Sequence, residues 1–261
     1  ESSSIDALFV VSDSMSFMEK ASINLNNQEV DIAIPIWTTT PWTLPANEAV
    51  VLGSAIKYSL IEATLNNNSI YLLIADDLID SVCDRYDLQQ WKILGEIDPN
   101  QIKGALLKHP FYDKQVPLLI GDYVTTDSGT GAVHTAPAHG HDDFMMGKKF
   151  GLPLESPVNE YGVYEEGTEL FSGHHISKVD DQIIETLKEN KTLANNQKFM
   201  HSYPHCWRHK TPLIFRATRQ WFIAMEGENF RNNCLNAIKE VEWFPSWGEE
   251  RIEGMVSGRP D

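Results

Sequence analysis

The fold of this chain is decided by residues 57–74, KYSLIEATLNNNSIYLLI. Two runs rich in Ile, Leu and Tyr, residues 57–63 and 69–74, flank the polar residues 66–68, NNN. Short runs of this composition, bounded by turn-forming residues, are typical of β-strands. The stretch therefore predicts two strands and indicates that a sheet is the centre of the fold.

Further strands are predicted on both sides of this stretch. Their runs have the same short, apolar character, and Pro35 makes one of them an edge or bulged strand because proline cannot donate to a ladder. We expect these strands at residues 5–12, 31–37, 91–97, 104–108, 116–120 and 131–135.

Helices are fewer, and they are predicted where capping or acidic residues precede an apolar face. Because the strands and helices do not alternate regularly, we expect a β-rich mixed α and β fold, a barrel with peripheral helices. The expected helices are residues 76–86 capped by Asp76, a short helix with Asp142 and Asp143 in its first turn and Gly151 at its end, a helix after the capping box at 177–180, and residues 229–240 and 248–257.

Composition and charge narrow the class of protein. The 261 residues are 42% hydrophobic, enough for a real core, and no apolar run reaches the ~18 residues that a membrane span needs. Three widely spaced cysteines fit a reducing cytoplasm, and the absence of an initial Met suggests a piece of a longer chain. A net charge of -16 argues against strong independent binding of nucleic acid, but it allows contact with the end of one that is held elsewhere.

The first chemically suggestive segment is WTTTPWTLPAN, residues 37–47, which gathers four threonine hydroxyls around a Pro-Trp corner. Two prolines fix an extended, turning backbone, so the segment could form a rigid pocket wall that Asn47 braces. Threonine also favours sheets, and a half-exposed strand surface is the alternative interpretation.

The second segment is GTGAVHTAPAHGHDDF, residues 129–144, in which three histidines and two aspartates lie within ten residues. Its glycines permit a tight turn, but the Lys and hydroxyl of a phosphate loop are missing. Carboxylates here could hold a small cation, and the His and Asp residues also allow a metal site. For Asp142 alone, we favour a role as helix cap.

A third region begins near residue 198, where the chain becomes aromatic and locally basic up to residue 225 and is predicted to form a β-ribbon. Cys206 and His209 have the spacing of half a zinc site, and His201 and His205 lie nearby. A second half-site of similar spacing is missing, so a structural ribbon is the alternative.

Together these segments resemble the inserted editing (CP1) domain of isoleucyl-tRNA synthetases, which belong to the class I aminoacyl-tRNA synthetases. HSYPHCWRHKTPLIFRATRQWF, residues 201–222, is similar to the segment that returns to the synthetic core of those enzymes. Thr40 stands where valyl and leucyl relatives have an Arg. The resemblance implies a closed β-barrel core with peripheral helices, an editing domain over residues 1–197, and a ribbon and helices over 198–261 that lead to the absent core.

The resemblance also implies roles for individual residues. Asp143 matches the aspartate that binds the α-amino group of the misattached amino acid, and the threonines would hold the ester and terminal adenosine and position water. Trp42 and His134 would line the side-chain pocket. The implied catalytic residues are Asp143, Thr39 and Thr40, and the implied substrate-binding residues are Thr38, Trp42, Thr43, Asn47 and His134.

The implied function is post-transfer editing, the hydrolysis of the aminoacyl ester of Val-tRNA(Ile). The HIGH and KMSKS motifs, the ATP-binding signatures of these synthetases, are missing, so the chain should not form aminoacyl-adenylate. We expect no cofactor or metal in this chain, with ATP and any zinc belonging to the longer enzyme. The expected partners are the tRNA 3′ end and the rest of the synthetase, with no membrane and a monomeric chain. Two alternatives stay open: a metal-dependent hydrolase built on His134, His139, His141 and Asp143, and a non-catalytic module that binds the tRNA end.

Overall fold

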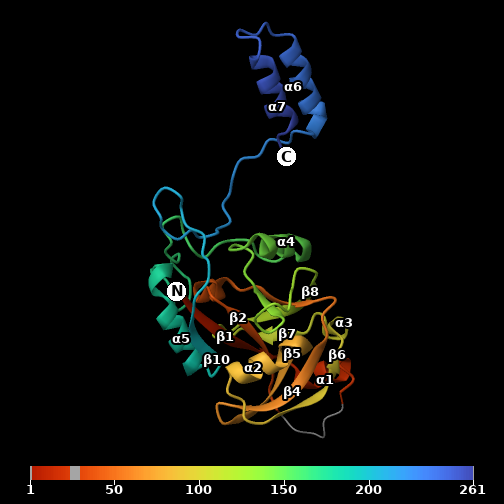
Figure 1. The fold of residues 1–261 in the computed structure, drawn as a ribbon, viewed down its shortest axis with the longest axis vertical. Helices are drawn as coiled ribbons and strands as arrows, with labels where there is room; N and C mark the ends of the chain where they lie inside the picture. Colours follow the sequence, from red (N-terminus) through yellow and green to blue (C-terminus); the bar gives the residue numbers. More distant parts are fainter. Residues whose placement is uncertain (1, 24–29, 261) are drawn as a thin grey trace. The chain divides into compact units, whose positions relative to one another are not determined.

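The computed structural model describes residues 2–23 and 30–260, and the chain forms two compact units, Glu1–Ala217 and Thr218–Asp261. The first unit contains a ten-stranded sheet with the order β6-β4-β5-β2-β1-β7-β8-β3-β9, while β10 pairs with β1 off this path (Figure 1). The strands are β1 (Ser2–Val11), β2 (Ile32–Thr38), β3 (Ala49–Gly53), β4 (Tyr58–Leu65), β5 (Asn68–Ala75), β6 (Trp91–Ile97), β7 (Leu106–Lys108), β8 (Gln115–Gly121), β9 (Ala132–Thr135) and β10 (Leu193–Phe199).

The predicted pair of strands in residues 57–74 is confirmed as the β4–β5 hairpin. Its antiparallel register runs from Tyr58 opposite Ala75 to Leu65 opposite Asn68, which leaves a two-residue loop. Asn66 and Asn67 both have positive φ, 52° and 65°, as expected of the tight turns that match the twist of paired strands. Asparagine tolerates this backbone region, so the NNN signal has a direct structural cause.

The expectation of a closed barrel is wrong, because the described strands form an open sheet. Strand β1 divides its pairing among three partners: β2 lies along one edge, and β10 and then β7 lie along the other. The sheet therefore forks at β1. The two ends of the strand path, β6 and β9, pair only with β4 and β3 among the described residues.

Pro35 lies in a strand inside the sheet, yet its local position is an edge. β2 pairs with β1 through Pro35, but its pairing with β5 covers only Ile32 and Ala33. Beyond that point no β5 ladder requires the N–H that proline lacks. The free Pro35 carbonyl instead accepts a hydrogen bond from the Thr130 hydroxyl at 2.6 Å.

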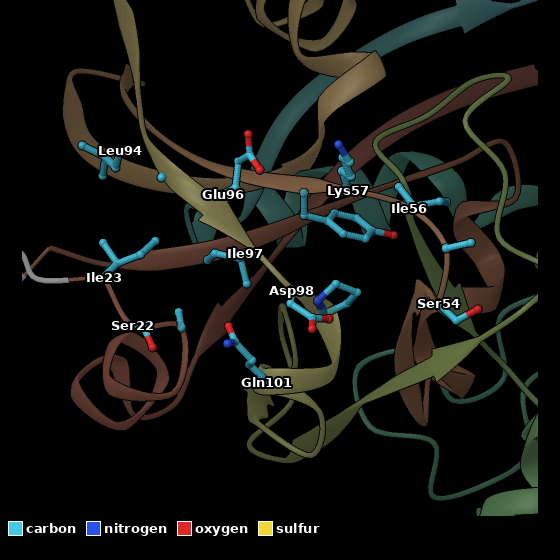
Figure 2. A pocket seen from close by; sticks show the side chains of 15 residues that line it. Ser22, Ile23, Ser54, Ile56, Lys57, Leu94, Glu96, Ile97, Asp98 and Gln101 are labelled. Carbon is cyan, nitrogen blue, oxygen red and sulfur yellow. The ribbon is translucent and has the colours of Figure 1, made fainter.

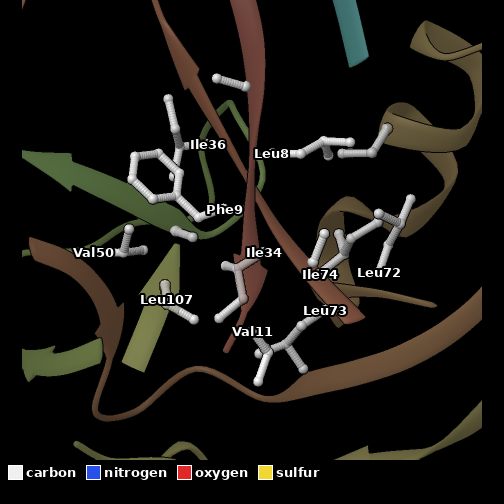
Figure 3. Packing of buried hydrophobic residues seen from close by; sticks show 14 of the residues in the cluster. Leu8, Phe9, Val11, Ile34, Ile36, Val50, Leu72, Leu73, Ile74 and Leu107 are labelled. Atoms are coloured by element: carbon white, nitrogen blue, oxygen red, sulfur yellow. The ribbon is translucent and has the colours of Figure 1, made fainter. Parts of the chain in front are cut away.

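The core of the first unit lies under β1 and β2. Phe9, Ile34 and Ile36 from these strands pack with Val50 from β3 and Leu107 from β7, and all five are fully buried (Figure 3). Ile34 and Ile36 lie two residues apart, so their side chains point to the same face of β2. By packing with Val50, they hold the ends of β2 and β3 in place. The threonine segment connects those two ends.

The helices of the first unit are short and lie around the sheet, and α5 packs beside β10 and β1 (Figure 1). Two predicted caps are wrong: residues 76–78 form a 3₁₀ turn without an Asp76 side-chain cap, and the residue before α5 is Val179, which caps nothing. The helices are α1 (Ser14–Lys20), η1 (Pro41–Ala46), η2 (Asp76–Leu78), α2 (Ile79–Arg85), α3 (Pro99–Ile102), α4 (His141–Phe150), η3 (Ile176–Lys178) and α5 (Asp180–Glu189).

The second unit contains η4 (Gly227–Asn229), α6 (Phe230–Lys239) and α7 (Gly248–Ser257), and both predicted helices there are confirmed. The predicted β-ribbon over 198–225 is wrong in extent, because its described pairing is one isolated bridge between His205 and Pro212. Prolines in this stretch lack the N–H that a β-ladder needs, and a turn at residues 207–209 interrupts it. No helix in the described part of the chain is long and apolar enough to cross a membrane.

Candidate functional site

The threonine segment is a buried turn rather than a half-exposed strand surface. Strand β2 ends at Thr38, whose Oγ1 accepts a hydrogen bond from the Thr40 N–H at 3.1 Å. The 3₁₀ helix η1 then begins at Pro41, which suits a first helical position, and all of its residues are buried. Thr43 donates from Oγ1 to the Thr40 carbonyl at 2.9 Å, and Thr39 and Thr40 stay half-buried at the surface of the turn.

His134 joins the two predicted segments. It lies on β9, which pairs with β3 directly after the threonine turn, and it is 9% exposed. Its Nε2 is 2.9 Å from Thr43 Oγ1, and its Nδ1 is 2.7 Å from Asn47 Nδ2. Three of the predicted site residues, Thr43, Asn47 and His134, therefore form one hydrogen-bonded network.

The network assigns the tautomer of His134. The Asn47 amide donates one hydrogen to the Ala49 carbonyl and the other to His134, so Nδ1 must accept. Nε2–H then donates to Thr43, whose own hydroxyl hydrogen goes to the Thr40 carbonyl. Burial, followed by the charges of His139 and Lys114, lowers the His134 pKa to about 3. The ring is neutral, and both of its nitrogens are occupied.

Asp143 lies in the first turn of α4, as predicted, while the residue before the helix is Gly140 and Asp142 caps nothing. Its Oδ2 accepts a hydrogen bond from the Ala136 N–H at 3.0 Å, which ties the carboxylate to the chain two residues beyond His134. Burial, opposed by this bond and assisted by the Asp142 charge, raises the Asp143 pKa to about 6. The carboxylate is half-buried and poised to gain from a cationic partner.

A second ring contact connects the segments. The rings of Trp42 and His139 meet edge-to-face with their centroids 4.9 Å apart. His139 is 8% exposed, its Nδ1 lies 2.9 Å from the Phe215 carbonyl, and burial lowers its pKa. His141 and Asp142, by contrast, are exposed on α4.

Three residues that sequence reasoning missed hold the turn from behind. The Tyr164 hydroxyl donates to the Trp42 carbonyl at 2.5 Å, Lys114 Nζ donates to the Asn47 carbonyl at 2.5 Å, and the His109 ring bonds the Leu44 carbonyl at 3.1 Å. All three bind backbone groups, so no side-chain motif signals them. These three residues lie far from the threonine segment in the sequence, so only the folded structure shows their contacts with it.

Among residues 2–23 and 30–260, no group of three His, Cys, Asp or Glu side chains is placed to hold a metal ion. Cys206 Sγ and His209 Nδ1 lie 3.5 Å apart in the exposed turn. Figure 2 shows a cavity of about 750 Å³ elsewhere in the first unit, lined by residues such as Lys57, Glu96 and Asp98. None of the predicted site residues lines it.

Residues 19–199 match the family model described as "Leucyl-tRNA synthetase, editing domain". Among curated relatives, isoleucine--tRNA ligases of Vibrio vulnificus (strain YJ016) and Francisella tularensis subsp. novicida (strain U112) are each 48% identical over 261 and 260 residues, 100% of this chain. The chain spans about a quarter of the length of these relatives, 27% in both cases.

Solved structures agree at the level of the fold. The crystal structure of the P. knowlesi cytosolic leucyl-tRNA synthetase editing domain superimposes with a TM-score of 0.58 at 10% identity, covering 73% of this chain and 95% of that one. A family match over most of the chain accompanies this likeness. The chain therefore belongs to the editing-domain family of aminoacyl-tRNA synthetases, the proofreading hydrolase modules of these enzymes, and it is similar over its whole length to isoleucine--tRNA ligases.

Proposed function

We propose that this chain carries out post-transfer editing by hydrolysing the aminoacyl ester of valine misattached to tRNA(Ile). One observation carries the proposal: the threonine turn and the His134–Asp143 segment, 87 residues apart between Asn47 and His134, meet through a buried hydrogen-bond network that uses both nitrogens of the His134 ring. Such a network holds the half-buried hydroxyls of the turn rigidly beside the chain that carries Asp143. Pre-organised polar groups of this kind suit a site that acts by positioning.

Asp143 is the anchor for the substrate in this proposal. An aminoacyl ester carries a free ammonium, and a carboxylate with one oxygen already bonded to Ala136 can accept from it with the other. The ammonium also offsets the burial that raises the Asp143 pKa to about 6. Binding of a cation should therefore pull the carboxylate into its charged form.

Thr39 and Thr40 are proposed to act on the ester and the attacking water. They are the half-buried members of the turn, whereas Thr38 and Thr43 are buried. The Thr40 hydroxyl lies 3.2 Å from the Thr38 hydroxyl, which orients it within the turn. Thr38 and Thr43 then bind the substrate region mainly by shaping this surface, and Asn47 fixes His134. Trp42 and His134 form the wall that limits the side chain, since both are rigid and buried.

No general base is assigned. His134 is the obvious candidate, but its Nδ1 lone pair faces the Asn47 amide and its Nε2 carries the proton. An aminoacyl ester is already activated, so positioning a water and polarising the carbonyl can suffice. A ribose hydroxyl of the tRNA next to the ester could receive the proton.

Editing is needed because a pocket that selects amino acids by size cannot exclude a slightly smaller one. One methylene in an apolar pocket is worth only about 1–3 kcal/mol, and isoleucine against valine is the reference case for that magnitude. A second site that hydrolyses the smaller product supplies the missing discrimination. The wall of Trp42 and His134 would make that selection here.

The proposed partners follow from the charge and from the relatives. With a net charge of -16, the chain would receive only the tRNA 3′ end, while the rest of a longer synthetase in the cytoplasm holds the tRNA body. We propose a monomer that needs no metal or other cofactor for the editing step.

Deacylation of Val-tRNA(Ile) and Ile-tRNA(Ile) by this chain and by Asp143→Ala tests the proposal. We expect faster release of valine than of isoleucine, and a loss of about 100-fold in Asp143→Ala. Equal release of both amino acids, or full activity of the variant, would refute it. Inhibition by a chelator would instead favour the metal-dependent hydrolase, and tight binding of a valyl-adenosine ester without turnover would favour the non-catalytic module.

A further inference from the structure

The last three residues of the first unit, Phe215, Arg216 and Ala217, each make one bond to the body of that unit. We call residues 215–217 the strap. The Phe215 carbonyl accepts from His139 Nδ1 at 2.9 Å, and the Ala217 N–H donates to the Ala138 carbonyl at 2.7 Å. Arg216 Nη1 lies 3.5 Å from the Val158 carbonyl. Three consecutive bonds on an otherwise irregular segment fix its path.

One arm of the strap reaches Asp143. His139 and Ala138 are both buried, and the His139 N–H donates to the Ala136 carbonyl at 2.8 Å. The N–H of the same Ala136 is the donor to Asp143 Oδ2 at 3.0 Å. The position of the strap is therefore coupled to that of the Asp143 carboxylate through the short turn between Ala136 and His139.

The other arm reaches Trp42. The carbonyl that Arg216 bonds belongs to Val158, which forms an antiparallel bridge with Tyr164. The Tyr164 hydroxyl in turn donates to the Trp42 carbonyl at 2.5 Å. Both segments of the proposed site are thus linked to the strap, and Trp42 also touches the His139 ring directly.

The buried His139 ring has one nitrogen without a hydrogen-bond partner, and the bond from its other nitrogen to the strap explains why this cost is tolerated. Its Nδ1 must bear the hydrogen that the Phe215 carbonyl accepts, so its Nε2 is a lone-pair acceptor. That atom is buried and has no hydrogen-bond partner among the described residues. An apolar side chain would fill the same space without this cost, so the histidine is retained for its donor at Nδ1.

We propose that the strap is a positioning element of the editing site and that His139 is the positioning residue that fastens it. This inference rests on the proposed function and adds a means of control to it. Because Thr218 begins the second unit, tension on the chain beyond the strap acts on His139, Ala138 and Val158. Release of the strap would loosen Asp143 and Trp42 together and lower turnover.

Variants of His139 separate the donor from the ring. His139→Asn keeps an N–H donor near the Nδ1 position, while His139→Phe keeps a ring against Trp42 but removes the donor. Ala217→Pro removes a different strap bond and leaves His139 intact. We expect kcat for Val-tRNA(Ile) deacylation to fall about 10-fold in His139→Phe and Ala217→Pro, with KM little changed, and to recover to within about 3-fold of wild type in His139→Asn.

Two readouts do not depend on activity. Trypsin cleavage after Arg216 should speed up about 10-fold in His139→Phe, while cleavage after Arg208 in the exposed turn stays constant. Ala217→Pro is left out of this readout, because trypsin does not cut before proline. The Asp143 pKa, measured by NMR, should fall from about 6 toward 3.8 as the loosened turn admits water. His139→Asn should resemble wild type in both.

The outcomes distinguish the two proposals. An active wild type would overturn the strap, while leaving the editing function in place, if kcat and the Asp143 pKa are unchanged in His139→Phe and Ala217→Pro and cleavage is unchanged in His139→Phe. An inactive wild type would support the strap and overturn the editing function if both variants still change the Asp143 pKa and His139→Phe is still cleaved faster. Loss of kcat in His139→Asn equal to that in His139→Phe would overturn the role of the Nδ1 donor.

Discussion

Asn47 and His134 bond through the amide Nδ2 and the ring Nδ1, 2.7 Å apart, although one lies after the threonine turn and the other on β9. The contact fixes the ring in the Nε2–H form and removes its free lone pair. A histidine held in this way is a wall and a brace, not a proton acceptor. This contact also sets the rest of the network. With Nδ1 as the acceptor, the ring donates from Nε2 to Thr43, and Thr43 donates to the Thr40 carbonyl.

His134 should stay neutral throughout the pH range in which editing would operate. Burial is the main cause that lowers its pKa from 6.5 to about 3. Between these values the unfolded chain binds the extra proton, so His134 contributes stability above pH 6.5 that is lost as pH falls toward 3. Ring ¹⁵N shifts followed by NMR from pH 8 to 5 should not move, and a midpoint near 6.5 would contradict the network.

Thr43→Val should destabilise the chain by about 1–3 kcal/mol, since it leaves the buried His134 N–H without a partner and removes one of the two hydrogen bonds that the Thr40 carbonyl accepts. Valine keeps the branched shape, so the loss reports the hydroxyl. Urea unfolding measures the change. Thr43→Ser is the matched control and should cost less than about 1 kcal/mol. A stable Thr43→Val with full deacylation would mean that the network is dispensable.

Asp143→Asn should stabilise the fold while it greatly lowers the rate of editing. The Asp143 pKa is raised from 3.8 to about 6, so the folded chain binds the extra proton between these values and loses stability as pH rises through them. Asparagine keeps an acceptor for Ala136 without the charge, and we expect a gain of about 1 kcal/mol at pH 7 after allowing for solvent screening. Thermal unfolding at pH 4 and pH 7 checks this, since the gain should vanish at pH 4.

The rate of deacylation should rise with pH as Asp143 ionises, with a midpoint near 6. This inflection should be absent from the residual activity of Asp143→Asn. A profile that is flat between pH 5 and 7 in the wild type would argue that the ionised carboxylate is not needed.

The sequence predicted the elements whose signals are local. The β4–β5 hairpin follows from two short runs rich in Ile, Leu and Tyr around an asparagine turn, and α4 follows from its acidic first turn and Gly151, which has φ +67°. Strand β10, LANNQKF, was missed because its residues are mostly polar and half-exposed, and only pairing with β1 makes it a strand. The closed barrel was wrong because the fork at β1 depends on three distant partners.

The candidate site was predictable as two motifs but not as a network. Recognition of the motifs selected Thr43, Asn47 and His134, and the fold adds that Thr43 and Asn47 bond the two nitrogens of the His134 ring. Tyr164 reaches the site through a backbone carbonyl, so nothing in its spacing announces it. The sequence suggests His139 only as a metal ligand, and its ring contact with Trp42 becomes visible in the fold. Residues that act on the backbone of others are invisible until the chain is folded.

The buried ion pair between Arg85 and Asp6 should be structural and sensitive to pH. Arg85 bonds both Asp6 oxygens, at 2.9 and 3.2 Å, and also the Gly129 carbonyl, which ties α2 to β1 and to the turn before β9. Burial outweighs the arginine and raises the Asp6 pKa. Arg85→Met should cost about 3–5 kcal/mol at pH 7, because it leaves a buried charge.

The cost of Arg85→Met should shrink as pH falls toward 5, because Asp6 can then take up a proton instead of remaining charged. Adding Asp6→Leu to Arg85→Met should recover most of the loss at pH 7. Denaturant unfolding of the single and double variants at both pH values measures these differences. An equal cost at pH 7 and pH 5 would show that the buried charge is not the cause.

Gly131→Ala should be the most damaging of the glycine changes in the GTGAVH segment. Gly131 has φ +83°, and an added Cβ would lie 2.3 Å from the Cβ of Ala75. Its carbonyl also accepts from the Tyr58 hydroxyl at 2.6 Å, and β9 begins at the next residue. Backbone strain plus overpacking should cost about 2–5 kcal/mol and should shift His134 away from Thr43.

Gly151→Ala provides the matched control for this change, since Gly151 has φ +67° but open space within 4 Å of an added Cβ. This variant introduces only the strain of the left-handed backbone, about 1–2 kcal/mol. It should leave deacylation unchanged, because Gly151 lies at the end of α4 and Asp143 lies in its first turn. Comparable losses of stability and activity in both variants would mean that backbone strain alone, and not the packing of β9 against Ala75, sets the position of His134.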